Sequence, residues 1–584
     1  MSAKVITKKF CENGIKYYLK SLYVVKFRRE EFCYLYENDA WGDGSTSRVL
    51  DKLVNDDGIF PSAEDKTFLF QYALDKKHLK IIKALEKGNF DRHEFRFEDG
   101  KSAVHYLAER SESERVIKRV NRSLIKNFFL NHSQQDFFPN YPRKNYCDAH
   151  GYTYFHAACM VDDERVVRKF LSKGVNVNLD TYTCSPLFIA AQYKNEETVK
   201  LLLEHKANPN QSDHEGSTPL HALALPCLCE CRTKWHTCDT RKPVENLVKM
   251  LLENGADIEA RNRHGDTPLQ SAVMRFDVAL TKSLLDHGAS LSSLNEKRMF
   301  TQTFSSLELT TYAVSLDIIE VMQLLQSAGY NMDFRTKLRM VECWTRIHGN
   351  DLDRMLVKDK GSKYLLAGGK NQVVDIYVQM ADQLAIHKLY GFYMKPEVKD
   401  YMIKRCKQLR STIPYNWRTY VDFDEGDVIL EDNPYHVNSL VLRKINDIEI
   451  TEDVSLYKLC KMNYSKGYSI LKNIKNWRVP QMDNLTCRST FARFVARRHL
   501  SNIAIRLALD LELLAADLFM TDYCSLNLPH HVCLKVAKNL GYEELFRLFE
   551  KINVDELEKL CESVEGTNQN GTMERRTRLV RLTF

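Results

Sequence analysis

Apolar residues in the first half of the chain recur in short clusters, and within each cluster they are spaced like one face of an α-helix. A spacing of three to four residues brings side chains onto a common helical face. The pattern therefore predicts a succession of short amphipathic helices. The clearest clusters are Val166, Val167, Phe170 and Leu171; Val199, Leu202 and Leu203; Val248, Leu251 and Leu252; and Leu284 and Leu285.

A short phrase of Thr or Ser, often followed by Pro and Leu, precedes these clusters at a regular interval. Its clearest copies begin at Thr218 and Thr267, and weaker copies begin at Thr153 and Ser185. Successive copies are 32, 33 and 49 residues apart, and the last interval equals 33 with an insertion of 16. Thr or Ser caps a helix N-terminus, and Pro has the φ value that the first helical turn requires. The phrase therefore marks the start of the first helix in each repeat.

Two further positions recur in each unit. Asp or Asn lies five residues before the capping residue, where it is expected to begin a turn. A glycine follows the second apolar cluster, where it is expected to adopt the left-handed conformation that ends a helix. The turn residues are Asp148, Asp180, Asp213 and Asn262, and the glycines are Gly174, Gly255 and Gly288.

Together these positions resemble the ankyrin repeat. The resemblance implies a solenoid of stacked helix pairs that binds another protein through its exposed loops and first helices. Weaker copies from Thr67, Ser102 and Glu308 extend the array to about seven repeats over residues 61–335. Residues 1–60 are predicted to form an N-terminal helical cap.

The loops before the capping residues are the expected target-binding surface. Tyr182, Arg261 and Arg263 are the expected anchors, because aromatic and Arg side chains dominate binding energy at interfaces. The alternative for any one of these residues is a solvated side chain without a partner, and the identity of the target is not encoded in the pattern. The candidate contact residues are Tyr182, Asp180, His214, Arg261, Arg263 and His264.

The C-terminal part changes to compact helices, predicted over Ser489–Arg498 and Ser501–Met520. A third helix is expected to open at Leu528-Pro529, with Val532, Val536 and Leu540 on one face, and a further helix follows around Leu545. This layout resembles the start of an F-box, although His531 stands where that family has an acidic residue.

Ankyrin repeats followed by such a module resemble the PRANC-domain proteins of poxviruses, parasitoid wasps and their bacterial endosymbionts. The resemblance implies that the module docks a Skp-type adaptor of a cullin ubiquitin ligase, so that the protein acts as a substrate adaptor. The alternative is a scaffold that sequesters its partner, with the C-terminal helices serving only as a cap. The docking residues would be Leu528, Pro529, Val532, Val536, Leu540 and Leu545.

The expected fold is therefore all-α. An ankyrin solenoid over 61–335 is followed by a helical region of unclear type over 336–484, by an F-box-like domain over 485–565 and by a basic tail over 566–584. A nuclear-import or nucleic-acid role for the tail is the weaker alternative to a solvated chain end.

An insertion at residues 226–243 is unusually rich in cysteine. Four thiols and one imidazole within twelve residues form a candidate tetrahedral zinc site. The alternative is a solvated loop with reduced thiols, because ligands in a Cys-x-Cys spacing are strained in one tetrahedral site. The candidate ligands are Cys227, Cys229, Cys231, His236 and Cys238. No other cofactor is expected.

Composition limits the classes of function and the cellular locations that are expected. The formal net charge of +7 over 584 residues is too small to indicate nucleic-acid binding by itself. The 16 cysteines are scattered, as in proteins of a reducing compartment, and no segment is predicted to span a membrane. The location is therefore expected to be cytoplasmic, with the nucleus as an alternative. The sequence contains no known catalytic motif, so an enzyme is not expected. His105, His156 and His221 are expected to form hydrogen bonds within their own helical turns.

Overall fold

The computed structural model describes parts of the chain that fall into two compact units, residues 1–190 with 200–207 and residues 191–199 with 208–584. The boundary runs through one helix pair, α11 (Pro186–Gln192) and α12 (Glu196–Glu204). The predicted N-terminal cap and basic tail lie outside the described residues. These are 63–76, 81–82, 85, 95–97, 100–113, 122–129, 145–226, 243–304, 314–348, 380–381, 384, 387–388, 391–394, 396–409, 439–475, 477–480, 490–508, 511–520, 528–540 and 542–549.

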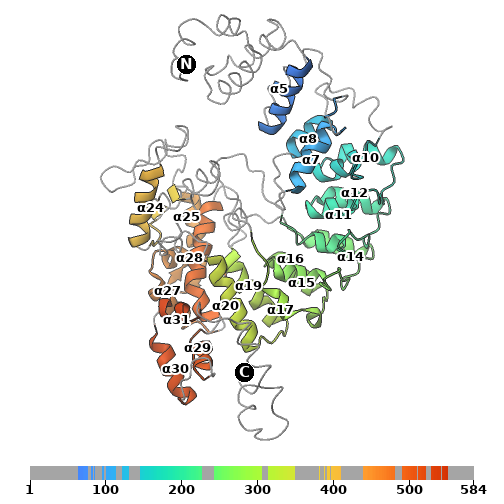
Figure 1. Cartoon of the computed structure of the whole chain (residues 1–584). Helices are drawn as coiled ribbons and strands as arrows, with labels where there is room; N and C mark the ends of the chain where they lie inside the picture. The colour runs from blue at the N-terminus through green and yellow to red at the C-terminus, as the bar shows by residue number, and fades with distance from the viewer. Residues whose placement is uncertain are drawn as a thin grey trace, which may run out of the picture. The chain divides into compact units, whose positions relative to one another are not determined.

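The first unit is built from short helices that pack on their neighbours (Figure 1). Helix α9 contacts α7, α8 and α10, and all of its residues are buried. The Phe129 ring lies edge-on to the rings of Tyr154 and Phe170, with centroid distances of 6.1 and 6.3 Å. Aromatic rings thus fill the spaces between successive helices. The helices are α5 (Ala63–Lys76), α7 (Ala103–Ser113), α8 (Arg122–Phe129), α9 (Tyr154–Val161) and α10 (Glu164–Ser172).

The second unit begins with the remaining repeats. Helix α13 packs on α14 and α15, both of these pack on α16, and α16 packs on α19. Such contacts between successive neighbours are those of a helical solenoid, and the predicted all-α fold is confirmed. The helices are α13 (Pro219–Ala222), α14 (Glu245–Glu253), α15 (Pro268–Met274), α16 (Val278–Asp286), the 3₁₀ turn η4 (Leu291–Ser293), α17 (Glu296–Met299), α19 (Val314–Ser327) and α20 (Phe334–His348).

Helix ends in both units follow the predicted chemistry. The Ser185 hydroxyl accepts a hydrogen bond from the backbone N–H of Phe188 at 3.1 Å, and Thr267 accepts one from Gln270 at 3.2 Å. These bonds satisfy backbone donors that a helix N-terminus leaves free. The predicted left-handed glycines are confirmed, with φ values of +77° at Gly174, +88° at Gly255 and +88° at Gly288.

Where it is described, the C-terminal part of the second unit consists of helices and loops together with one short hairpin, which the sequence pattern does not predict. In that hairpin β1 (Glu449–Thr451) pairs antiparallel with β2 (Val454–Ser455). The helices are α24 (Pro396–Leu409), α25 (Ser439–Asn446), α26 (Leu456–Cys460), α27 (Tyr464–Leu471), α28 (Thr490–Ala508), α29 (Leu511–Phe519), α30 (His530–Asn539) and α31 (Tyr542–Phe549).

The predicted break between helices at residues 499–500 is wrong. Helix α28 runs without interruption from Thr490 to Ala508, and the next helix begins at Leu511. Neither Gly nor Pro occurs within α28. Ala496, Leu500 and Ala504 are fully buried at four-residue intervals, so one continuous face of the helix faces the core.

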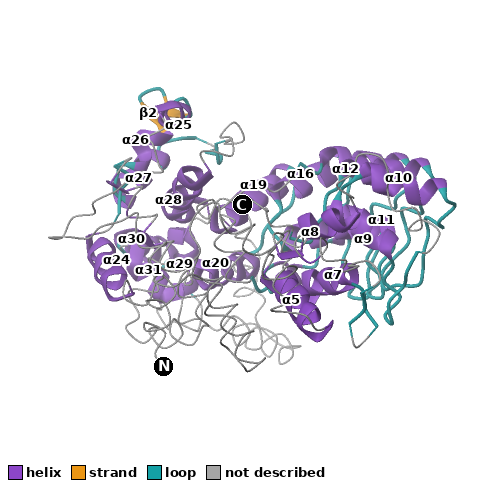
Figure 2. Cartoon of the chain, turned by 90° about the horizontal axis from the view of Figure 1, so that it is seen from above, coloured by secondary structure: helices purple, strands orange, loops and turns teal. Residues whose placement is uncertain are grey.

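The C-terminal helices pack directly on the last repeat. Helix α19 contacts α28, and α20 contacts both α29 and α31. Figure 2 shows α20, α29, α30 and α31 as neighbours. The fully buried Trp344 of α20 donates from Nε1 to the hydroxyl of Ser501 in α28, 3.3 Å away. The repeats of the second unit and these helices therefore share one core.

Candidate functional site

The loops that precede the first helices are closed by a carboxylate or amide side chain. The Asp213 carboxylate accepts from the backbone N–H groups of Glu215 and Ser217 at 2.9 and 2.7 Å. Asn262 accepts from His264 and Asp266 in the same way, at 3.0 Å each. These bonds confirm the predicted turns and fix the conformation of the residues between them.

Gly216 lets its loop approach the loop that contains Arg263 closely. Gly216 has φ of +75°, and a Cβ atom at this position would lie 3.2 Å from the backbone N of Arg263. That same N–H group donates to the carbonyl oxygen of Glu215 at 2.8 Å, which joins the two tips. Neither Gly216 nor its counterpart Gly265 was predicted. Each lies three residues after a turn-forming Asp or Asn, as Gly151 does after Asp148, whereas Thr183 occupies that position after Asp180.

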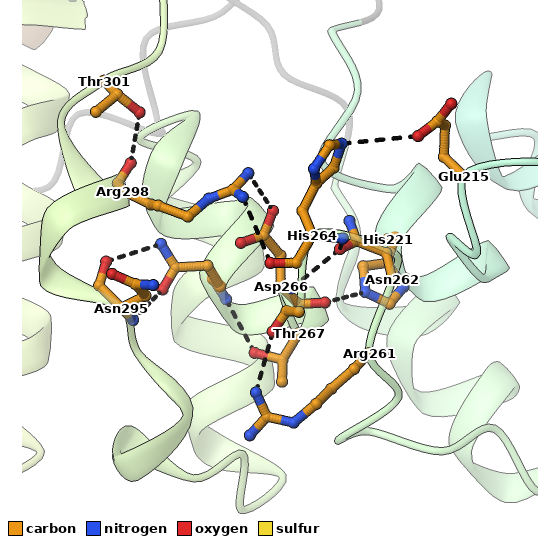
Figure 3. Close-up of polar contacts among 12 residues, drawn as sticks. Glu215, His221, Arg261, Asn262, His264, Asp266, Thr267, Asn295, Arg298 and Thr301 are labelled. Atoms are coloured by element: carbon orange, nitrogen blue, oxygen red, sulfur yellow. Dashed lines mark hydrogen bonds and ion pairs between the residues drawn. The ribbon is translucent and has the colours of Figure 1, made fainter.

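The joined tips bring two histidines to one carboxylate, and Figure 3 shows the contact of Glu215 with one of them, His264. One carboxylate oxygen of Glu215 lies 3.3 Å from Nε2 of His214, and the other lies 3.6 Å from Nε2 of His264. The side chains of all three residues are at least 45% exposed. The two histidines are among the predicted contact residues, whereas the glutamate between them was not predicted.

An ion pair between the half-buried Arg298 and the buried Asp266 supports the loop at Asn262 from the next repeat. Arg298 of α17 donates to the Asp266 carboxylate at 2.8 Å and to the carbonyl of His264 at 3.4 Å (Figure 3). Burial raises the pKa of Asp266 above its ordinary value, and the Arg298 guanidinium opposes that rise. No local pattern identifies Arg298, because the pairing depends on how successive repeats stack.

The predicted contact residues differ in the solvent exposure of their side chains. In the second unit His214, Arg261, Arg263 and His264 are all exposed. In the first unit Asp180 is exposed, but Tyr182 is only half-exposed. The Tyr182 ring packs edge-on against Tyr152 at 5.0 Å, so much of its apolar surface is already covered.

The histidines within the helical turns are structural, as predicted. The backbone N–H of Thr153 donates to Nδ1 of His156 at 3.1 Å, and Thr218 donates to His221 at the same distance. Burial lowers the pKa of His156 to about 3, partly opposed by the backbone of Cys184. His105 likewise lies 3.0 Å from the Ser102 hydroxyl. These imidazoles stay neutral and hold the loops.

The C-terminal helices carry a second candidate surface. Leu528 is 41% exposed, Val536 39% and Met520 41%, and these are the large hydrophobic side chains exposed in the described parts of the chain. Val532 and Leu540 are half-buried, and Pro529 is exposed. We call Met520, Leu528 and Val536 the apolar patch.

The buried face of α30 lies one residue away from the predicted face. Cys533 and Ala537 are fully buried, whereas Val532 and Val536 lie beside them, partly or largely exposed. Small side chains at 533 and 537 allow the close contact that α30 makes with α29. Leu545 is fully buried in α31, so its predicted docking role is wrong: it forms part of the core.

The candidate zinc ligands Cys227, Cys229, Cys231, His236 and Cys238 lie outside the described residues. Within the described parts of the chain, no group of three or more His, Cys, Asp or Glu side chains is placed to hold a metal ion. In those same parts, no helix has the length and apolar character needed to cross a bilayer.

Comparison with known proteins identifies the repeats. Residues 117–213 match the family model for ankyrin repeats in three copies, and residues 241–285 match the model for ankyrin repeats in many copies. The chain therefore contains ankyrin repeats, a class of protein-binding scaffold. Both matched models describe such scaffolds, and neither indicates a catalytic family.

Two curated proteins share this similarity. The ankyrin repeat protein FPV222 of Fowlpox virus (strain NVSL) is 38% identical over 60 residues, which cover 10% of this chain and 8% of that protein. Alpha-latrotoxin-Lg1a of Latrodectus geometricus is 36% identical over 88 residues, or 15% of this chain and 6% of the toxin. The chain thus matches less than a tenth of the length of either relative.

Proposed function

We propose that this protein is a two-surface adaptor. The ankyrin loops capture a target protein, and the apolar patch docks a Skp-type adaptor of a cullin ubiquitin ligase. The protein itself performs no catalysis in this role. It raises the effective concentration of the target at the ligase.

The observation that carries this proposal is the exposure of the apolar patch. Among the described residues, the large hydrophobic side chains that are exposed all belong to α30 or to chain next to α29 and α30: Met520 follows α29, Leu528 precedes α30, and Val536 lies within α30. Because α29 and α30 pack on each other, these side chains belong to neighbouring elements, and exposed apolar surface of this kind is typical of interaction sites. Half-buried Val532 and Leu540 extend the apolar character along the same helix.

The alternative is an ankyrin scaffold that sequesters its partner without any link to a ubiquitin ligase. The packing of α28 on α19, and of α29 and α31 on α20, favours this second role, because solenoids need a cap at their exposed ends. A cap alone, however, gains nothing from leaving Leu528 and Val536 in water.

Point variants separate the two roles better than a truncation does. Removing the chain after α29 would delete Leu545, which is fully buried, and would expose the core. The Val536→Glu variant introduces a charge at a side chain that is 39% exposed, so the fold is retained. We expect binding of a purified Skp-type adaptor to the full chain to fall at least tenfold, because a charge in an apolar interface is strongly unfavourable.

The matched control is Asn539→Glu, which adds the same charge at an exposed polar position of the same helix. It is expected to leave adaptor binding within twofold of the wild-type chain. Equal binding by wild-type, Val536→Glu and Asn539→Glu chains, or no binding by any of them, would favour the sequestering scaffold.

We also place the protein in the cytoplasm or nucleus. The thiols of Cys159, Cys343 and Cys460 are buried and form no disulfide, and burial raises the pKa of each. Buried neutral thiols of this kind suit a reducing compartment, where they act as small apolar side chains. Fluorescence microscopy of the tagged full-length chain tests this location, and secretion into the medium would contradict it.

A further inference from the structure

Two arginines flank Asn262 on the tip that precedes α15, and we call Arg261 and Arg263 the arginine tip. Both side chains are exposed. The backbone of Arg263 is fixed by its bond to Glu215, while its guanidinium has no ion-pair partner among the described residues. Arg261 donates to the carbonyl of Gly265 at 3.0 Å, which orients the side chain without neutralising its charge.

Four described carboxylates in this loop, in the loop before it and in the following repeat contact residues other than Arg261 and Arg263. Asp266 is buried against Arg298, and Glu215 lies between two histidines. One oxygen of Glu259 accepts from the backbone N–H of Ser290 at 2.7 Å. Glu296 accepts from the hydroxyl of Tyr330 at 2.8 Å. The positive charge of the arginine tip is therefore available to a partner.

We infer that the arginine tip binds an acidic segment of the target protein. This inference rests on the proposed function, in which the ankyrin loops capture a protein, and it adds the chemistry of what they capture. Guanidinium groups pair with carboxylates through two parallel hydrogen bonds, and Arg is enriched among residues that dominate interfaces. A loop held rigid by Asn262 and by the bond to Glu215 loses little conformational entropy when it binds.

The position of Glu215 favours a polypeptide over a nucleic acid. A nucleic-acid strand carries a negatively charged phosphate at every nucleotide and would place negative charge against this half-exposed carboxylate. An acidic polypeptide has separate side chains, so it can direct carboxylates to Arg261 and Arg263 and a neutral or donor group to Glu215.

The test uses the full chain and a fluorescein-labelled peptide of alternating Glu and Ser, with binding measured by fluorescence anisotropy. We expect the peptide to bind the wild-type chain and the Arg261→Gln/Arg263→Gln variant to bind it about three- to tenfold more weakly. The matched control is Lys249→Gln/Lys282→Gln. It removes the same charge from exposed positions on α14 and α16 and is expected to bind like the wild-type chain.

Three outcomes would overturn the inference. They are no binding of the Glu-Ser peptide, equal weakening in both double variants, and tighter binding of a thymidine oligonucleotide of the same length. The proposed function is judged separately by the adaptor measurement with Val536→Glu, since the arginine tip and the apolar patch share no residue. Failure of the acidic-segment inference with retained adaptor binding would leave the proposed function standing.

Discussion

The guanidinium of Arg497 in α28 donates to the carboxylate of Asp317 in α19 at 2.6 Å, although the two residues lie 180 positions apart in the sequence. It also donates to Glu320 at 3.2 Å. Both Arg497 and Asp317 are 7% exposed, so the pair is shielded from water. This contact fixes the C-terminal helices to the last repeat in a single orientation, and docking at the apolar patch would therefore occur on a body continuous with the last repeats of the second unit.

Removing one partner of this buried pair is expected to destabilise the second unit strongly. The Arg497→Ala variant leaves Asp317 buried without its counter-charge, and we expect the free energy of unfolding to fall by about 3 kcal/mol or more. Urea denaturation followed by circular dichroism measures the change. Arg261→Ala, at an exposed position, is the control and should change the free energy of unfolding by less than about 0.5 kcal/mol. Equal stability of the two variants would show that the pair does not fix α28 to α19.

The contact between adjacent loop tips gives a second prediction. Gly216→Ala introduces a Cβ atom 3.2 Å from the backbone N of Arg263, at a φ of +75° that alanine rarely adopts. Gly265→Ala is the matched control, because Gly265 has φ of +77° at the same loop position and nothing within 4 Å of its Cβ site. We expect both variants to be less stable by about 1 kcal/mol, and Gly216→Ala to lose roughly 1 kcal/mol more. If thermal unfolding shows the same loss of stability for both variants, the close contact between Gly216 and Arg263 does not contribute to stability.

Sequence patterns predicted the features that depend on neighbouring residues. Thr267, Asn262 and Gly288 each act within a few residues of their own position, so a cap, a turn or a helix end could be identified directly. Arg298 pairs with Asp266 across 32 positions and Arg497 with Asp317 across 180. Such pairs depend on how repeats and helices stack, and no local spacing indicates them.

The face of α30 shows why periodicity alone was insufficient. Val532 and Val536 are four residues apart, and so are Cys533 and Ala537, so both pairs define a plausible helical face. Hydrophobicity favoured the valines, but the close packing of α30 on α29 favoured the smaller side chains. Because Cys533 and Ala537 form the buried face of α30, Val536 remains exposed.

Acid is expected to destabilise the C-terminal helices through His499. Burial lowers the pKa of His499 to about 4, against 6.5 for an ordinary histidine, and the backbone of Leu459 opposes this shift. The unfolded chain therefore takes up a proton at a higher pH than the folded chain does. Stability falls as the pH drops from about 6.5 towards 4, and by pH 5 this residue has removed about 2 kcal/mol.

The His499→Gln variant keeps a hydrogen-bond donor without a group that titrates in this range. We expect its loss of stability between pH 7 and pH 5 to be smaller than that of the wild-type chain by about 2 kcal/mol. Urea denaturation at the two pH values measures the difference. Parallel pH profiles for the two chains would contradict a neutral, buried imidazole at this position.

The cysteine-rich insertion provides the last prediction. If Cys227, Cys229, Cys231, His236 and Cys238 supply a zinc site, the purified chain should carry one zinc per molecule, because four such ligands complete a tetrahedral shell. Cys229→Ser/Cys231→Ser should lose that zinc, whereas Cys147→Ser, at an exposed thiol outside the insertion, should retain it. A chelator should also lower the unfolding temperature of the wild-type chain and leave that of the double variant unchanged, since metal binding contributes to folding. Elemental analysis that finds equal zinc in both variants, or none in the wild-type chain, would identify the insertion as a loop with reduced thiols.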